Sequence, residues 1–250
     1  MNRKLKNFIR KNLGLPVYKN RVEINAVPIV DRKELLVPII ETLKLKINKD
    51  PHTPLRKSSF PAMTDHKLRK TVYDKLVEAS EKLPEGYTLF VFESFRPYAV
   101  QLERFNFKVA KLREKFPHLP QTEIERRARM GVADPRSGAP HQTGGAVDVT
   151  ILDTRNIPRP ASPFGQALNM GTDWAEFNKR TPTKNWPYLL FARTVLASFT
   201  IMRNRDMLVR AMTSAGFVNY PGEWWHYSYG DRAWACYSGK SEAMYGSVEE

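Results

Sequence analysis

Two runs along the chain carry residue types that could do chemistry. Only five residues are histidines, and His141 opens the run HQTGGAVD, which ends at Asp148. His226 closes the run EWWH, which begins at Glu223. Together the runs supply two imidazoles and a carboxylate as ligands, with a spare carboxylate three residues from one of them. That is the inventory of a catalytic zinc site, in which the spare carboxylate takes a proton from water.

The first run needs a fold-back before its two ends can share an ion. Seven residues would separate His141 from Asp148 by about 23 Å in a strand and by about 10 Å in a helix, whereas zinc–ligand bonds are near 2 Å. Gly144 and Gly145 allow the reversal, because glycine accepts positive φ at little cost. The alternative is an ordinary hairpin with a surface histidine and a turn-capping aspartate.

The second run needs an irregular backbone. A strict strand sends residues three apart to opposite faces, so Glu223 and His226 address one point only through a turn or a bulge. Pro221 and Gly222, just before the run, favour such an entry. The alternative is that the aromatic residues of this run belong to the core and Glu223 is exposed.

A zinc hydrolase also needs a donor for the oxyanion that forms when a carbonyl is attacked. Arg96 is the candidate, because Pro97 biases it toward an extended backbone at the end of a strand. The alternative is a helix-start arginine in a surface salt bridge. No metal-binding His-Glu-x-x-His helix, phosphate loop or nucleophile elbow competes with this interpretation. Cys236 is the single cysteine, which excludes disulfides and multi-cysteine zinc sites.

The elements expected to position these residues alternate between helices and strands. Apolar spacings of three and four predict helices, and short aromatic or β-branched runs predict strands. Thr122 and Glu125 suggest a capping box for a short helix that ends near Gly131. The expected elements are a helix over 68–83, a strand over 87–95, a helix over 97–112, a strand over 146–152, a helix over 204–215 and a strand over 224–229. We therefore predict an α+β fold, with a small, mainly antiparallel sheet flanked by helices and a single zinc site at the sheet.

Composition indicates a globular protein. The chain has 250 residues, 42% of them hydrophobic, and a formal net charge of +14. Residues 1–60 lack sustained periodicity and are expected to form a basic arm that packs on the core, with a catalytic domain over 61–250. Lysine and arginine are spread along the chain, so no nucleic-acid partner is expected. Without a recognisable signal or membrane span, a cytoplasmic location is expected.

Five segments along the chain resemble a known family. Ser94 to Pro97, His141 to Asp148, Met170 to Thr172, Asn204 to Phe217 and Glu223 to Tyr227 resemble, in order, the zinc D-alanyl-D-alanine dipeptidases of the vancomycin-resistance type. The resemblance covers about Leu68 to Tyr229, and the family is related to D,D-carboxypeptidases and hedgehog-like domains. It implies that residues 61–250 form a zinc dipeptidase domain that hydrolyses a small peptide.

The same resemblance assigns roles to residues. It implies one Zn²⁺ per chain with His141, Asp148 and His226 as ligands. Glu223 would be the general base, and Arg96 would steady the tetrahedral intermediate.

Two departures from the family pattern bear on the substrate. The family usually has serine where this chain has Ala139, and an acid for the dipeptide's amine where it has Ala175. Asp173, Trp174 and Glu176 are therefore the candidates for substrate binding. The alternative activity is that of a D,D-carboxypeptidase or related muropeptide hydrolase acting on peptidoglycan peptides.

A function of another class is a binding module whose arm lies on an anionic membrane surface. The basic and apolar residues at the N-terminus would make this weak contact. They are Lys4, Leu5, Lys6, Phe8, Ile9, Arg10 and Lys11.

Overall fold

The computed structural model describes residues 7, 17–53, 60–155, 167–184 and 195–248. The basic and apolar residues between positions 4 and 11 that were considered for membrane contact lie outside these ranges, so that contact stays a prediction. Among the described residues, no helix combines the length and the apolar character needed to cross a membrane.

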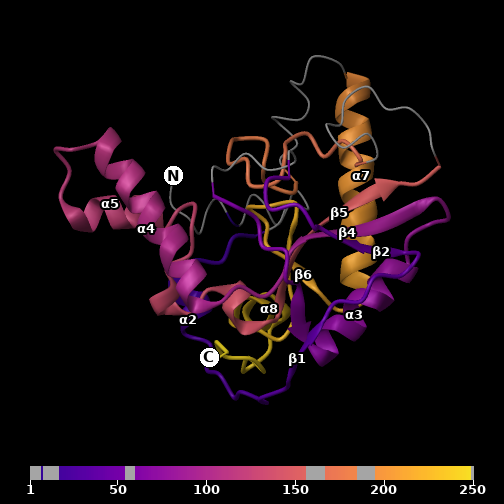
Figure 1. Ribbon diagram of the computed structural model, residues 1–250, viewed down its shortest axis with the longest axis horizontal. Coiled ribbons are helices and arrows are strands. Elements are labelled where there is room, and N and C mark those ends of the chain that lie inside the picture. Colours follow the sequence, from indigo (N-terminus) through magenta and orange to yellow (C-terminus); the bar gives the residue numbers. More distant parts are fainter. Residues whose placement is uncertain (1–6, 8–16, 54–59, 156–166, 185–194, 249–250) are drawn as a thin grey trace.

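A five-stranded sheet forms the centre of the molecule (Figure 1). Its spatial order is β2 (Leu45–Ile47), β4 (Tyr87–Glu93), β5 (Ala146–Asp153), β7 (His226–Ser228) and β6 (Val218–Asn219). The β2–β4 pairing is parallel and the other pairings in this sheet are antiparallel. The predicted α+β class is confirmed, and the sheet is mixed. A separate antiparallel pair joins β1 (Leu36–Pro38) to β3 (Lys67–Arg69).

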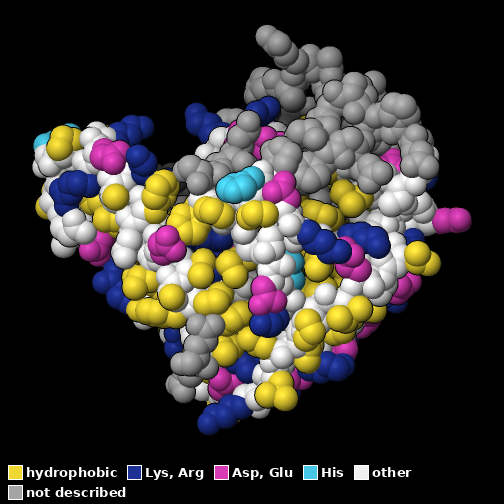
Figure 2. All heavy atoms as spheres, viewed as in Figure 1, with side chains coloured by type: hydrophobic (Ala, Val, Ile, Leu, Met, Phe, Trp, Pro, Cys, Tyr) yellow, Lys and Arg dark blue, Asp and Glu magenta, His cyan; other side chains and the backbone are white. Residues whose placement is uncertain are grey.

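Helices α3 (Lys70–Glu81) and α7 (Val195–Ser214) pack together with the sheet in one hydrophobic core. Val72, Leu76 and Ala79 of α3 are fully buried at the spacing that predicted this helix. Helices α4 (Tyr98–Lys115) and α5 (Gln121–Ala128) instead form a hairpin that projects from the body (Figure 1). Charges of both signs cover the outer part of that hairpin (Figure 2).

The first 60 residues contribute to the core through backbone pairing. Strand β2 adds to the edge of β4, and Leu45 is fully buried. The short helix α2 (Arg21–Asn25) contacts α8 (Arg232–Ser238) near the C-terminal end. A parallel edge strand was not expected from this segment, because three residues are too few to show a strand period.

Three sequence predictions about element ends are corrected. Helix α7 begins nine residues before Asn204, where the sequence pattern placed its start. The pattern of apolar residues did not show the buried face of this helix, because Asn204 and Arg205 are buried on it. Their side chains donate hydrogen bonds to the carbonyls of Asn169 and Met170. The capping box on α5 is absent, since Pro120 is the N-cap residue and Glu125 contacts Arg129. Strand β7 covers His226–Ser228 rather than 224–229.

Candidate active site

Sheet register places one residue from each of three strands in a row. Asp148 on β5 is paired with Glu93 on β4 and with His226 on β7. A bulge between Val91 and Glu93 shifts the β4–β5 register, so that Glu93, and not Phe92, stands opposite Asp148. Directly paired residues share a face of a sheet. The row therefore gathers a histidine and two carboxylates at one end of the sheet.

His141 reaches this row from a 3₁₀ turn, η2 (Pro140–Thr143). Gly144 follows in the left-handed region with a φ of 69°, which turns the chain into β5. The backbone N–H of Arg96 donates to the carbonyl of His141 at 3.0 Å, which ties this turn to the end of β4. The fold-back predicted from the glycine pair is therefore present.

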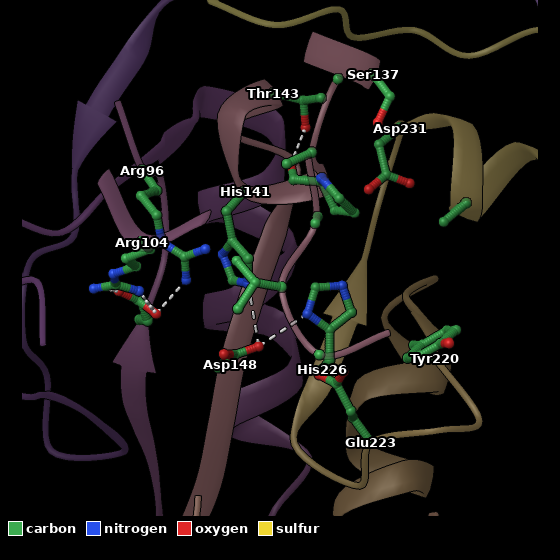
Figure 3. Close-up of a pocket in the computed structure, with 18 of the residues that line it drawn as sticks. Arg96, Arg104, Ser137, His141, Thr143, Asp148, Tyr220, Glu223, His226 and Asp231 are labelled. Carbon is green, nitrogen blue, oxygen red and sulfur yellow. Dashed lines mark hydrogen bonds and ion pairs between the residues drawn. The ribbon is translucent and has the colours of Figure 1, made fainter. Parts of the chain in front are cut away.

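The side chains of His141, Asp148 and His226 converge (Figure 3). One potential ligand atom from each lies within 4.8 Å of the other two, and all three residues are buried. Asp148 Oδ1 is 3.3 Å from His141 Nε2 and 2.9 Å from His226 Nδ1. Trp174 Nε1 donates to the other oxygen, Oδ2, at 3.0 Å and so fixes the plane of the carboxylate.

The donor set fits a divalent metal ion such as zinc. His141 Nδ1 is 2.7 Å from the carbonyl of Ser94, so the ring donates there and turns Nε2 toward Asp148. Although burial alone would raise it, the two neighbouring imidazoles hold the pKa of Asp148 well below its ordinary value. Two nitrogen ligands and an ionised carboxylate that meet in a buried site call for a shared cation.

Glu223 enters the same cavity from the turn before β7. Its N–H donates to the carbonyl of Tyr220 at 3.0 Å, which makes the irregular backbone that the sequence required. Figure 3 places Glu223 on the side of His226, across the site from Arg96 and Arg104. Burial raises the pKa of Glu223 to about 7, although His226 opposes this shift. A carboxylate with that pKa both accepts and releases a proton near neutral pH.

Arg96 lies on the cavity wall in a buried ion network that the sequence did not reveal. Its guanidinium contacts the carboxylate of Glu93 and the side-chain oxygen of Gln101. Arg104 also pairs with Glu93, at 2.6 Å. Arg96 is thus an inward-facing cation, and the alternative of a surface salt bridge does not describe it. The signal was a glutamate at the end of an otherwise apolar strand, three residues before the arginine.

The cavity has a volume of about 520 Å³. It is lined both by the His141, Asp148 and His226 cluster and by the Glu93, Arg96 and Arg104 network. Trp174 and Ala175 line it, as does Ala139, whereas Asp173 and Glu176 are not among its lining residues. Glu176 instead accepts hydrogen bonds from the backbone N–H of Asp173 and from a neighbouring asparagine side chain. Trp174 is nearly fully buried, and its indole N–H is the Asp148 donor described above.

Gly145 allows the closest backbone approach in the site. A Cβ at this position would lie 2.5 Å from the carbonyl oxygen of Tyr229, the residue that follows β7. We expect Gly145→Ala to lower the free energy of unfolding by about 1–3 kcal/mol, because β7 must move away from β5. Zinc affinity should fall as well, because His226 on β7 shifts with the strand. Urea unfolding measures the loss of stability, and zinc titration measures the loss of affinity. An alanine variant with wild-type stability and affinity would show that the two strands do not need this approach.

Comparisons with known proteins show which family the chain resembles. A family profile described as D-ala-D-ala dipeptidase matches residues 68–242. A D-alanyl-D-alanine dipeptidase from Synechocystis sp. is 28% identical over 233 residues, which cover 84% of this chain and 87% of that protein. A D-alanyl-D-alanine dipeptidase from Escherichia coli is 28% identical over 142 residues, which cover 57% of this chain and 55% of that protein.

Among solved structures, the chain is similar to the vancomycin-resistance D,D-pentapeptidase VanY in complex with Zn(II). The alignment covers 86% of this chain and 96% of the VanY chain, with 15% sequence identity and a TM-score of 0.40.

Proposed function

The chain belongs to the D-Ala-D-Ala dipeptidase family, and on this premise we propose that residues 61–250 form a zinc metallopeptidase that hydrolyses the D-alanyl-D-alanine dipeptide. The observation that carries the proposal is the convergence of His141, Asp148 and His226 in a cavity that also contains Glu223. One zinc ion held by the three ligands would polarise the scissile carbonyl and lower the pKa of water.

The chain's own residues account for the proton transfers and for the developing charge. Glu223 accepts a proton from the attacking water and returns it to the leaving amine, a cycle that its pKa of about 7 favours. Arg96 stands on the opposite wall, where its guanidinium meets the negative charge that develops on the carbonyl oxygen. Arg96 is buried, which strengthens its interaction with a negative charge.

The Arg96 role predicts a loss of rate without loss of the metal. We expect Arg96→Ala to lower kcat by about 10²–10³-fold, because the oxyanion loses a fixed cationic donor. Steady-state kinetics on D-Ala-D-Ala measures the effect, and zinc content checks the site. Arg126→Ala, on the exposed face of α5, is the matched control. A kcat within a few-fold of wild type would remove Arg96 from the reaction.

Metal removal tests the activity itself. Protein treated with a chelator is expected to release no D-alanine from D-Ala-D-Ala, and readdition of one equivalent of Zn²⁺ is expected to restore release. Metal analysis on the purified protein should find one zinc per chain. Hydrolysis that persists in fully zinc-free protein would overturn the proposal.

A second candidate substrate is a longer peptidoglycan peptide, which would make the enzyme a D,D-carboxypeptidase. Two observations favour it. The cavity of about 520 Å³ is in the range that accommodates ligands larger than a dipeptide, and Lys19, Lys108 and Lys111 line it. Its walls include neither Asp173 nor Glu176 to pair with the amine of a free dipeptide.

Competition between substrates separates the two activities. We would incubate the protein with free D-Ala-D-Ala and with a cell-wall pentapeptide, and compare kcat/KM for D-alanine release. A higher value for the dipeptide supports the first activity, and a higher value for the pentapeptide supports the second.

A further inference from the structure

Two buried polar residues lie on the far side of the His226 ring from Asp148. Ser228 Oγ is 3.5 Å from His226 Nε2, and Ser228 also interacts with the carboxylate of Asp231. Asp231 is the N-cap residue of α8, where its Oδ1 accepts a hydrogen bond from the backbone N–H of Trp234 at 2.7 Å. Ser228 and Asp231 are each 2% exposed. Neither is used in the mechanism above.

The second oxygen of Asp231 points to a role for this pair. Asp231 Oδ2 is buried, and no donor among the described residues meets the distance and angle of a hydrogen bond to it. Leaving a buried acceptor unsatisfied costs about 1–3 kcal/mol. Asp231 lines the same cavity as the metal ligands, and Figure 3 shows its carboxylate on the His226 side of the site. The hydroxyl of Ser228 is the donor that can satisfy it.

The single hydrogen of the Ser228 hydroxyl couples Asp231 to the tautomer of His226. If His226 Nε2 carries a proton, the Ser228 oxygen accepts a hydrogen bond from it, and the Ser228 hydroxyl can donate its own hydrogen to Asp231. His226 Nδ1 then presents a lone pair toward Asp148 Oδ1, which is 2.9 Å away. In the opposite tautomer, Nε2 would accept the hydroxyl hydrogen and Asp231 would lose its donor.

We propose that Asp231, acting through Ser228, is a positioning residue that holds His226 in the Nε2-protonated tautomer, so that Nδ1 is available to the metal. The inference rests on the proposed role of His226 as a ligand. Partners of this kind behind a metal-binding histidine contribute about 10- to 100-fold in metal affinity. Asp231 therefore raises zinc affinity without contacting the zinc or the substrate.

The test is the zinc dissociation constant of two variants, measured by competition with a chromophoric chelator. Asp231→Asn keeps the N-cap acceptor for α8, but its amide can donate to Ser228 and so favours the wrong tautomer. Ser228→Ala removes the connecting hydroxyl. Matched controls are Asp134→Asn, another buried N-cap aspartate, and Ser80→Ala, another buried serine. We expect at least about tenfold weaker zinc binding in both variants and wild-type binding in both controls.

A second measurement follows the tautomer directly. In zinc-free protein at alkaline pH, where the ring is neutral, ¹⁵N–¹H correlation spectra should show His226 protonated at Nε2 in the wild type and shifted toward Nδ1 in Asp231→Asn. Zinc affinity within twofold of wild type in either variant, or an unchanged tautomer, would overturn the proposal. Hydrolysis of D-Ala-D-Ala by the wild type is assayed in parallel. A protein that shows these zinc effects but hydrolyses no D,D-peptide would contradict the proposed function and leave this inference standing.

Discussion

Glu223→Gln is expected to lower kcat for D-Ala-D-Ala hydrolysis by about 10²–10⁴-fold while zinc remains bound. Glutamine has nearly the same shape as glutamate, so it preserves packing in the turn before β7. Its amide cannot accept a proton from water at neutral pH. Glu223 also lies outside the group of His141, Asp148 and His226, whose potential ligand atoms converge. Loss of the base should therefore spare the metal.

The measurement pairs steady-state kinetics with zinc analysis on the same sample. Glu81→Gln, at the exposed end of α3, serves as the control and should keep wild-type kcat. If kcat is unchanged in Glu223→Gln, another group takes the proton. If zinc is lost together with activity, Glu223 belongs to the metal site and not to proton transfer.

The clustering of His141, Asp148 and His226 could be predicted because the residue types that a metal site requires are rare in this chain. With five histidines in the whole chain, few combinations fit a metal site, and the glycine pair after His141 marks the reversal that brings it toward Asp148. Sheet register completes the arrangement by pairing Asp148 with His226. That pairing joins positions 78 residues apart, which no local pattern reveals.

The residues that position the site were harder to predict, because polar and charged residue types are usually expected on the protein surface. Helix α4 was predicted over 97–112 from apolar spacings of three and four, yet Tyr98 at its start is 45% exposed, and Gln101 and Arg104 are buried. These polar residues are buried because they bond to Glu93 and Arg96, which come from another element. A periodicity argument counts apolar residues and misses a face that is buried through ion pairs.

Trp174 illustrates the same limit. Its place in the sequence suggested a substrate contact, and the structure shows it on the cavity wall. It also stacks on Phe92, with ring centroids 4.8 Å apart, and donates to Asp148. Trp174, which orients the carboxylate of Asp148, thus comes from a loop more than twenty residues further along the chain. Only the packed structure shows this second contact.

Glu93→Gln is expected to destabilise the protein by about 3–5 kcal/mol, the range for removing one partner of a buried ion network. Glu93 is 1% exposed and faces both Arg96 and Arg104, which would be left as two buried cations repelling one another. Arg96 would also lose the partner that directs it into the cavity, so kcat should fall as well. Urea unfolding and steady-state kinetics measure the two effects.

The pH dependence of this loss follows from the direction of the Glu93 shift. Burial would raise the pKa of Glu93, but Arg96 and Arg104 overcome burial and hold it well below the ordinary value of 4.5. A depressed carboxyl pKa stabilises the fold above the unfolded pKa, and the contribution is lost as pH falls toward the folded value. The stability difference between wild type and Glu93→Gln should therefore be full at pH 7 and shrink below about pH 4.5.

A double variant separates charge balance from the positioning of Arg96. Adding Arg104→Met to Glu93→Gln removes one of the two uncompensated cations, so part of the lost stability should return. The rate should stay low, because Arg96 still lacks its carboxylate partner. Stability that fails to recover would mean that repulsion between Arg96 and Arg104 is not the source of the loss. Recovery of stability and rate together would show that Glu93 only balances charge, and that Gln101 suffices to direct Arg96 into the cavity.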